Sequence, residues 1–221
     1  MHILILALAV LIPGTAYAQK IGKDVELNLF LLGYQYANAE SLNKYVDEFN
    51  GAGTTTKNLD KVKTTGFIAA EILGVTDWDF GYGLRYSAIA TSSTGRQVPG
   101  GDVELTTGLI DFSAVFKFMS AADKFQYGAG LTIGMTSTTA IITKALGNTT
   151  VYTASAQPVA RGLLLGRFNF GRFALHGEGG YLYAKVPEFK ADSVKLTKAD
   201  GSNVELDMSG AYISIGLGWQ F

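Results

Sequence analysis

Apolar and polar residues alternate along most of the chain, in segments of ten or more residues that polar connections separate. The segment 125–136 is the plainest, because every second residue from Phe125 to Met135 is apolar and glycine, threonine or glutamine fills the positions between. A period of two with one apolar face is typical of a β-strand half-buried in apolar surroundings. Strands of soluble sandwiches usually have about five or six residues, whereas a tilted strand needs about 9–11 to cross a bilayer. The pattern therefore predicts strands that cross a membrane.

The alternation predicts eight such strands. Their approximate ranges are 24–37, 64–76, 80–92, 103–118, 125–140, 154–169, 172–186 and 204–221. The connections between strands two and three, four and five, and six and seven are short, and the other four connections are longer. Short periplasmic turns and long outer loops are the pattern of outer-membrane barrels. We therefore expect an all-β fold, an eight-stranded antiparallel transmembrane up-and-down β-barrel with short periplasmic turns and long extracellular loops, and with both termini in the periplasm.

Charged residues indicate which face of each strand points inward. Centring the turn between the second and third strands on Trp78 sets Glu71 opposite Arg85. Because an arginine on the lipid face costs about 2–4 kcal/mol near the midplane, both side chains are expected to face the lumen as a cross-strand ion pair. In the hairpin between the fourth and fifth strands, the same alternation favours pairing Phe118 with Phe125, both outward.

The same parity predicts a set of polar residues that face the lumen. An eight-stranded barrel leaves an interior just wide enough for side chains to fill, so we expect a hydrogen-bonded polar plug; a gated ion path is the alternative. The predicted set is Glu71, Arg85, Asp111, Lys117, Arg161, His176 and Glu178. In the sixth strand, Arg161 and Arg167 share their face with Leu163 and Leu165, which a β-bulge or a snorkelling Arg167 would accommodate.

The first long connection contains a predicted amphipathic helix, at about 39–50. Leu42, Tyr45, Val46 and Phe49 fall at i, i+3, i+4 and i+7 and form one apolar stripe. The favoured interpretation is a lid, folded over the barrel mouth or lying at the outer interface. A helix that binds in the groove of a partner is the alternative.

The last connection predicts a hairpin, because Asp200-Gly201 lies between the alternating segments 194–198 and 203–206. The seventh and eighth strands are therefore expected to continue above the membrane as a protruding ribbon, with the third long connection, around 146–148, beside it. Protruding strand edges can recruit an extended partner strand. An extracellular protein partner is thus expected at the loops, and mere shielding of the barrel is the alternative.

The N-terminal residues indicate export. Residues 3–12 form a short apolar run, and Pro13-Gly14 and the small-x-small sequence Ala16-Tyr17-Ala18 follow it, as in a secretory signal peptide. We expect a cleavable signal peptide at 1–18 and a mature barrel at 19–221. The basic segment that usually precedes the apolar run is missing, so the true start codon is left open.

Composition and charge argue against several classes of function. The 221 residues include no cysteine, and the formal net charge of −1 lacks the basic excess that nucleic-acid binding requires. Because His176 is the only histidine of the predicted mature chain, a transition-metal site has little to build on. We expect no cofactor, no metal and no nucleic-acid partner.

The last strand carries the most specific similarity to known proteins. Alternate apolar residues share one face there, namely Ile213, Ile215, Leu217, Trp219 and Phe221. Together with the strand number and loop asymmetry, this row resembles small outer-membrane barrels of the OmpA-transmembrane-domain, OmpX and opacity-protein type, over 24–221. The resemblance implies that the row is a signal for the barrel-assembly machinery. It also implies a place in the bacterial outer membrane, among its lipid and lipopolysaccharide.

The resemblance predicts architecture better than function, because this fold hosts adhesins, enzymes and inert anchors alike. We expect a non-enzymatic surface protein whose barrel is an anchor with a plugged lumen and whose loops act in surface interaction or envelope integrity. A small transporter or channel for ions or hydrophobic solutes is the alternative. A lipid A hydrolase is a third hypothesis, but those enzymes pair a His-x-Ser element with a glutamate, and here Glu178 follows His176 by two positions.

Overall fold

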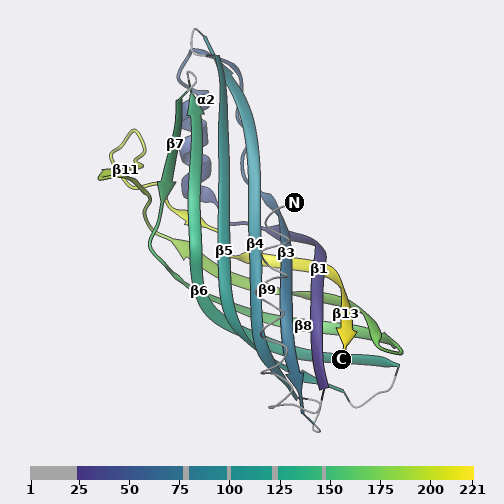
Figure 1. Cartoon of the computed structure of the whole chain (residues 1–221). Helices are drawn as coiled ribbons and strands as arrows, with labels where there is room; N and C mark the ends of the chain where they lie inside the picture. Colours follow the sequence, from purple (N-terminus) through teal and green to yellow (C-terminus); the bar gives the residue numbers. More distant parts are fainter. Residues whose placement is uncertain (1–23, 77–79, 99–100, 121–123, 146–147) are drawn as a thin grey trace.

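Eight long antiparallel strands close into a barrel in the computed structural model, which describes residues 24–76, 80–98, 101–120, 124–145 and 148–221 (Figure 1). The strands are β1 (Asp24–Tyr36), β3 (Thr64–Val75), β4 (Phe80–Gln97), β5 (Gly101–Met119), β6 (Phe125–Ala145), β8 (Pro158–Phe170), β9 (Phe173–Val186) and β13 (Gly210–Gln220). Each pairs with the next in this order, and β13 pairs with β1. The predicted eight-stranded barrel is confirmed. The predicted signal peptide and Trp78 lie outside the described residues.

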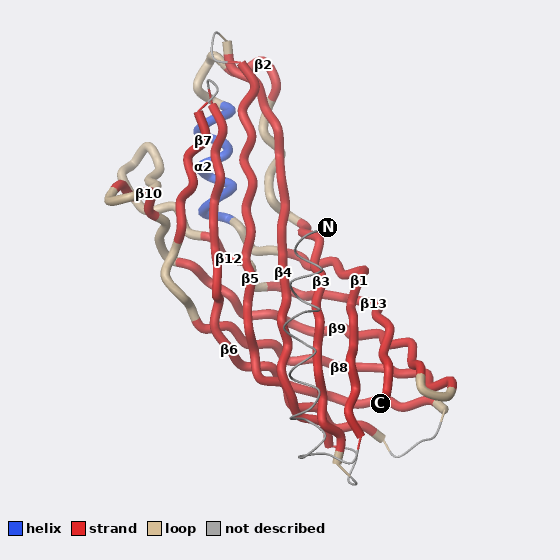
Figure 2. The backbone as a smooth tube through the Cα atoms, viewed as in Figure 1, coloured by secondary structure: helices blue, strands red, loops and turns tan. Residues whose placement is uncertain are grey.

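The other elements all lie in the longer connections. They are α2 (Glu40–Asn50), β2 (Thr55–Lys57), β7 (Asn148–Thr153), β10 (Lys190–Ala191), β11 (Val194–Lys195) and β12 (Leu206–Asp207). Among the described residues, no helix is long and apolar enough to cross a membrane. The helix and short strands gather at one end of the barrel, where Figure 2 places α2 beside the tall strands.

Alternation along each strand gives the barrel an exposed apolar outer face and a buried inner face. On β6, Leu131, Ile133 and Met135 are exposed, whereas Thr132 and Thr136 are buried. The predicted register of Glu71 opposite Arg85 is confirmed.

The predicted register of the hairpin between β5 and β6 is wrong by four residues. Phe118 pairs with Ala129, and Phe125 pairs instead with Phe168 of β8. Strands in a closed barrel are tilted and therefore staggered. A slip by an even number keeps every side chain on its face, so the inward and outward sets hold as far as Thr136. A β-bulge follows there, because Asp111 pairs with Thr136 and Ile110 with Thr138, and above it Thr139 and Ile141 turn inward.

A sheet of β4, β5, β6 and β7 rises above the rest of the barrel (Figures 1 and 2). β4 and β6 extend to Gln97 and Ala145, beyond their predicted ends, and β7 pairs with the upper part of β6. The predicted ribbon of the seventh and eighth strands is wrong, because β9 ends at Val186 and β13 begins at Gly210. The apolar residues between them, such as Leu196 and Leu206, are buried against the rest of the protein rather than raised above it.

The sixth barrel strand, β8, accommodates its arginines without a β-bulge and without a snorkelling Arg167. It pairs with β6 and β9 without a break in register. Arg161, Leu163, Leu165 and Arg167 are all buried on its inner face. The inner face of this strand therefore holds two leucines between two arginines, with glycine at two of the outward positions.

Candidate functional site

Four charged side chains meet inside the barrel and form what we call the charge ring: Glu71 of β3, Arg85 of β4, Lys117 of β5 and Glu178 of β9. Lys117 Nζ lies 2.6 Å from Glu71 Oε1 and 2.8 Å from Glu178 Oε1. Arg85 Nη1 lies 2.9 Å from Glu178 Oε2 and 3.5 Å from Glu71 Oε2. All four side chains are at most 2% exposed. Each cation therefore contacts both anions, and the ring is neutral as a whole.

The surroundings of the charge ring supply further contacts. Asn28 of β1 donates a hydrogen bond from Nδ2 to Glu71 Oε1, at 3.1 Å. The ring of Phe30 lies 4.8 Å from the guanidinium carbon of Arg85 and 5.5 Å from Lys117 Nζ, both cation–π distances. Taking a charge out of water costs several kcal/mol per ion. Attraction between the alternating positive and negative side chains of the charge ring offsets this desolvation cost.

A second ion pair lies beside the charge ring, between Asp111 of β5 and Arg161 of β8. The guanidinium donates from Nη2 to Oδ2 at 2.6 Å and from Nη1 to Oδ1 at 3.0 Å. Ser87 and Ser113 donate to the two carboxylate oxygens, at 2.7 and 2.9 Å. This bidentate pair links β5 and β8, which are not neighbours in the barrel wall, and so it also crosses the lumen.

His176 lies inside the barrel, where its ring packs edge-to-face against Phe30 at a centroid distance of 6.1 Å. A Cβ atom at Gly218 would overlap its Nε2 atom, so glycine makes room for the imidazole. Nearby on β8, Arg167 is buried and pairs with Glu26 of β1. The histidine thus points away from the outer face, where the hydrolase hypothesis would need it to meet lipid.

The structure places all seven predicted lumen residues in the interior but divides them. Four form the charge ring, Asp111 and Arg161 form the second pair, and His176 joins neither. Sequence reasoning missed Ser87 and Asn28, which complete these groups. Ser87 has the same parity as Arg85, and that parity was the signal available for it. Ser113 shares the parity of Asp111 and Lys117 and faces inward with them, as the alternation predicts. No group of three or more histidine, cysteine or carboxylate side chains among the described residues could hold a metal ion.

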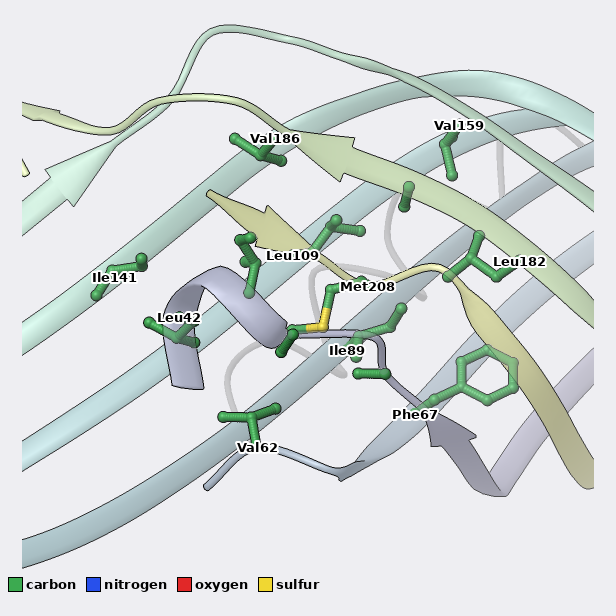
Figure 3. Close-up of a cluster of buried hydrophobic side chains, with 14 of the residues drawn as sticks. Leu42, Val62, Phe67, Ile89, Leu109, Ile141, Val159, Leu182, Val186 and Met208 are labelled. Carbon is green, nitrogen blue, oxygen red and sulfur yellow. The ribbon is translucent and has the colours of Figure 1, made fainter. Parts of the chain in front are cut away.

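The interior towards the loops is apolar, which differs from the expected polar lumen. Inward residues of four strands form the core of this apolar cluster: Ile89, Leu109, Ile141 and Leu182. Figure 3 shows them with Met208 of the last connection and Leu42 of α2. Ile89 and Leu109 share the inward parity of Arg85 and Asp111, and Leu182 shares that of Glu178, so the sequence carried a signal for these three. Ile141 has the outward parity of Met135 and turns inward because of the β-bulge in β6. The barrel therefore has a charged layer and an apolar layer.

The helix α2 covers the apolar cluster with the predicted stripe. Leu42 and Val46 are fully buried, and Tyr45 and Phe49 pack against the cluster from the edge. This placement agrees with the lid interpretation, because the stripe is already occupied within the chain. The helix ends at Asn50, and Gly51 follows as its C-cap.

Two asparagines fix α2 to the segment before β3, a contact that sequence reasoning missed. The Asn43 side chain donates to the Val62 carbonyl at 2.8 Å and accepts from the Val62 N–H at 2.7 Å. The Asn50 side chain does the same with Leu59, at 3.0 and 2.8 Å. The seven-residue spacing puts both amides on one side of the helix, which was the only sequence signal.

The fourth long connection forms its predicted turn and then packs against α2. Gly201 has a positive φ of 80°, and Asp200 accepts a hydrogen bond from the Ser202 N–H at 2.9 Å. Lys44 of α2 donates to Asp200 at 2.8 Å, and this hydrogen bond is the main reason that the pKa of Asp200 is lowered. Glu188, in the same connection, has its pKa lowered to about 2 by hydrogen bonds from Lys190 and Lys195.

The last strand carries its apolar row on the outer face. The row of Ile213, Ile215, Leu217, Trp219 and Phe221 is exposed throughout. At its end, Trp219 packs against Phe173 at a centroid distance of 4.7 Å. The role of this row as an assembly signal stays a prediction.

Comparisons with known proteins support the fold. No protein-family model and no curated protein matches the chain. The outer-membrane protein OprG of Pseudomonas aeruginosa superposes with a TM-score of 0.50 at 11% identity, over 90% of this chain and 96% of that one. The attachment invasion locus protein Ail of Yersinia pestis gives 0.46 at 11% identity, over 91% and 100%. The outer membrane protease OmpT of Escherichia coli gives 0.47 at 10%, over 91% and 98%.

Such identities show the fold alone. Membership of the OmpA, OmpX and opacity-protein group therefore stays a prediction, and whether the chain is an enzyme does not follow from these neighbours. The chain has the fold of a small outer-membrane β-barrel, as OprG does.

Proposed function

We propose that this protein is a non-enzymatic surface protein of the bacterial outer membrane, in which the barrel is an anchor and the sheet of β4 to β7 carries the interaction surface. The outer face supports the membrane location. Exposed apolar side chains cover it on every barrel strand, among them Leu84, Phe112, Leu131 and Leu164. Apolar surface of that extent is typical of proteins that meet lipid or a partner.

The filled lumen is the observation that carries the proposal. The charge ring and the pair of Asp111 with Arg161 occupy one part of the interior, and the apolar cluster under α2 occupies the rest. Side chains in both layers are almost inaccessible to solvent. A closed interior of this kind suits an anchor better than a pore, so the activity belongs to the parts outside the membrane.

The free edge of β7 is the best candidate for that activity. β6 pairs with β7 from Asn148 to Thr153, whereas on the other side only Thr153 has a partner among the described strands, Lys190 of β10. An unpaired edge is a template on which a further strand can form. We therefore place an extended peptide of an extracellular partner along β7 above Thr153.

Planar bilayers test the closed lumen. The purified barrel is expected to give no reproducible conductance steps, because the charge ring and the apolar cluster block the interior. Single-channel conductance on the scale of a general porin, tied to this protein, would overturn the proposal. For β7, binding to an array of synthetic extended peptides is expected to fall in Val151→Lys, because an edge lysine opposes strand addition. Val194→Lys, at an exposed valine of the fourth connection, is the matched control.

A small channel is the second candidate, and one observation favours it. Within the described residues, several buried polar atoms on β1, β9 and β13 have no hydrogen-bond partner: Asn28 Oδ1, His176 Nε2, Tyr212 Oη and Ser214 Oγ. Such atoms could bind a passing ion or solute. In that case Arg85→Gln should change ion selectivity, whereas an anchor with a plug would lose stability and still not conduct.

A further inference from the structure

A cavity of about 770 Å³ opens at the barrel mouth, between the start of α2, the end of β1 and the last connection. Basic and acidic side chains line it together. The basic ones are Lys44, Lys61, Lys63, Lys185 and Lys198, and the acidic ones are Glu40, Asp47, Glu205 and Asp207. The rest of the lining is largely small or polar, so any ligand that fits here is recognised through charge.

Not every lysine of the cavity forms an ion pair within the described residues. Lys61 pairs with Asp47 at 2.8 Å, and Lys185 pairs with Glu205 at 3.2 Å. Lys63 has neither an ion pair nor a side-chain hydrogen bond within the described part of the chain. The two ion pairs, Lys61 with Asp47 and Lys185 with Glu205, are exposed, and exposed pairs contribute little stability. An anionic ligand can therefore replace the carboxylate as the partner of either lysine at small energetic cost.

Two residues of the cavity wall also belong to the outer face of the barrel. Tyr36 follows Tyr34 on the outward row of β1, and both are more than 60% exposed. Lys185 follows Tyr181 and Tyr183 on the outward row of β9. The cavity therefore continues the surface that meets lipid and does not stand apart from it.

Tyrosines border the outer face of β13 just below the cavity. β13 lies between β1 and β9, and its register sets Ile213 opposite Tyr34 and Ala211 opposite Tyr181. The small side chain of Ala211 thus lies beside Tyr181 of β9, two residues before Ile213, which is opposite Tyr34 of β1. Tyrosine is enriched at the level of lipid headgroups, and lysines above such a row can reach lipid phosphates.

We propose that this cavity binds the phosphorylated headgroup of an outer-leaflet glycolipid. Lys63, Lys198 and Lys185 contact the phosphate, and an acyl chain follows the strip over Ala211 between the tyrosines. Ammonium–phosphate contacts are charge-assisted and point-like, which suits lysine. The inference rests on the proposed outer-membrane location, but it concerns neither the closed lumen nor the edge of β7.

Binding of defined lipids to the purified full-length barrel in detergent tests the proposal, with native mass spectrometry as the readout. The probes are a diphosphorylated lipid A, its dephosphorylated form and inorganic phosphate. Lys63→Gln is expected to weaken binding of the diphosphorylated lipid about threefold, a size typical of one exposed charge contact. Asp207→Asn is expected to strengthen it by a similar factor, because a competing negative charge is removed. Lys57→Gln, on β2 away from the cavity, is the matched control and should change nothing.

Opposite effects of Lys63→Gln and Asp207→Asn would support a phosphate site, since damage to the fold would weaken binding in both. Equal binding of the phosphorylated and dephosphorylated lipids would overturn the proposal. So would an effect of Lys57→Gln as large as that of Lys63→Gln, or inorganic phosphate that displaces the lipid at equal concentration. The lipid-binding results do not depend on the conductance or peptide-binding tests. Failure of the glycolipid site can therefore be distinguished from failure of the proposed function.

Discussion

Lys117 Nζ lies 2.6 Å from Glu71 Oε1, although β4 separates their strands, β5 and β3, in the barrel wall. The contact therefore passes across the interior and not along the wall. The same lysine reaches Glu178 on β9, at 2.8 Å. Such contacts join strands that share no backbone hydrogen bonds, and they make the charge ring a brace as well as a plug.

Removing one anion of the charge ring should destabilise the barrel strongly. In Glu71→Gln, Arg85 and Lys117 would share Glu178 as their only carboxylate partner, and one positive charge would stay buried without compensation. Breaking a buried ion pair on one side costs about 3–5 kcal/mol. Urea unfolding of the barrel in lipid vesicles measures the loss. Glu40→Gln, at the exposed start of α2, should leave the free energy of unfolding unchanged, and an equal effect there would contradict this account.

Backbone crowding between β3 and β4 makes a second prediction. A Cβ atom at Gly83 would overlap the carbonyl oxygen of Ile72, whereas one at Gly66 would meet nothing within 4 Å. Gly83→Ala should therefore cost about 1–3 kcal/mol, as overpacking does. Gly66→Ala should be neutral or slightly stabilising, because it reduces the freedom of the unfolded chain. The same unfolding measurement compares them, and equal values would show that β4 can shift to relieve the overlap.

Alternation predicts the face of most strand residues and the pair of Glu71 with Arg85. It predicts neither the β-bulges in β1 and β6, which reverse the alternation, nor the contacts that cross the lumen. Alternation fixes whether Arg85 or Leu84 points inward, because charge on the lipid face is costly. It gives no distance across the lumen, since that depends on tilt and stagger. Alternation therefore predicts neither the four-residue shift of register at Phe118 nor the contact of Lys117 with Glu71.

The upper part of the sheet was underestimated for a related reason. Above Ala90, both faces of β4 carry serine, threonine or other polar residues, so the alternation that marks a lipid-facing strand disappears. Pairing with β5 continues there as far as Gln97 opposite Gly101. The buried face of this region is apolar only on β5 and β6, where Leu105 and Ile141 belong to the same apolar cluster as Leu42 of α2. Packing of this kind between distant segments leaves no pattern in the local sequence.

The asparagine contacts of α2 predict a local effect without a global one. Asn43→Ala removes both hydrogen bonds to Val62 and leaves those backbone groups without their partner. We expect faster proteolysis between Gly51 and Lys63, and unchanged urea unfolding of the barrel strands, because the charge ring and the wall do not involve α2. Asn58→Ala, an exposed asparagine of the same connection, is the control. Slower cleavage in Asn43→Ala, or equal acceleration in both variants, would contradict this role.

Acid should loosen the fourth connection before it affects the rest of the loops. The pKa of Glu188 is lowered from 4.5 to about 2, mainly by the hydrogen bond from Lys190. A carboxylate with a lowered folded-state pKa contributes stability above its unfolded pKa and loses it as the pH falls through the folded value. The protection of residues 188–196 against hydrogen exchange, measured relative to the intrinsic rate at each pH, is therefore expected to fall between about pH 4.5 and pH 2, and Glu188→Gln should remove that dependence. An unchanged pH profile in the variant would assign the effect to other groups.

Arginine placed at two heights on one strand locates the membrane. Phe112 and Thr106 lie on the same outer face of β5, six residues apart, which is about 20 Å along a strand. Phe112 pairs with Tyr86 and Met135 inside the apolar band, whereas Thr106 pairs with Ser92 on one side and Ile142 on the other, where hydroxyl groups begin to interrupt that band. An outward arginine costs about 2–4 kcal/mol near the midplane and about 0–1 kcal/mol at the interface. Phe112→Arg should therefore destabilise the vesicle-bound barrel by that larger amount and Thr106→Arg hardly at all, whereas equal costs would mean that the bilayer does not end between these two residues.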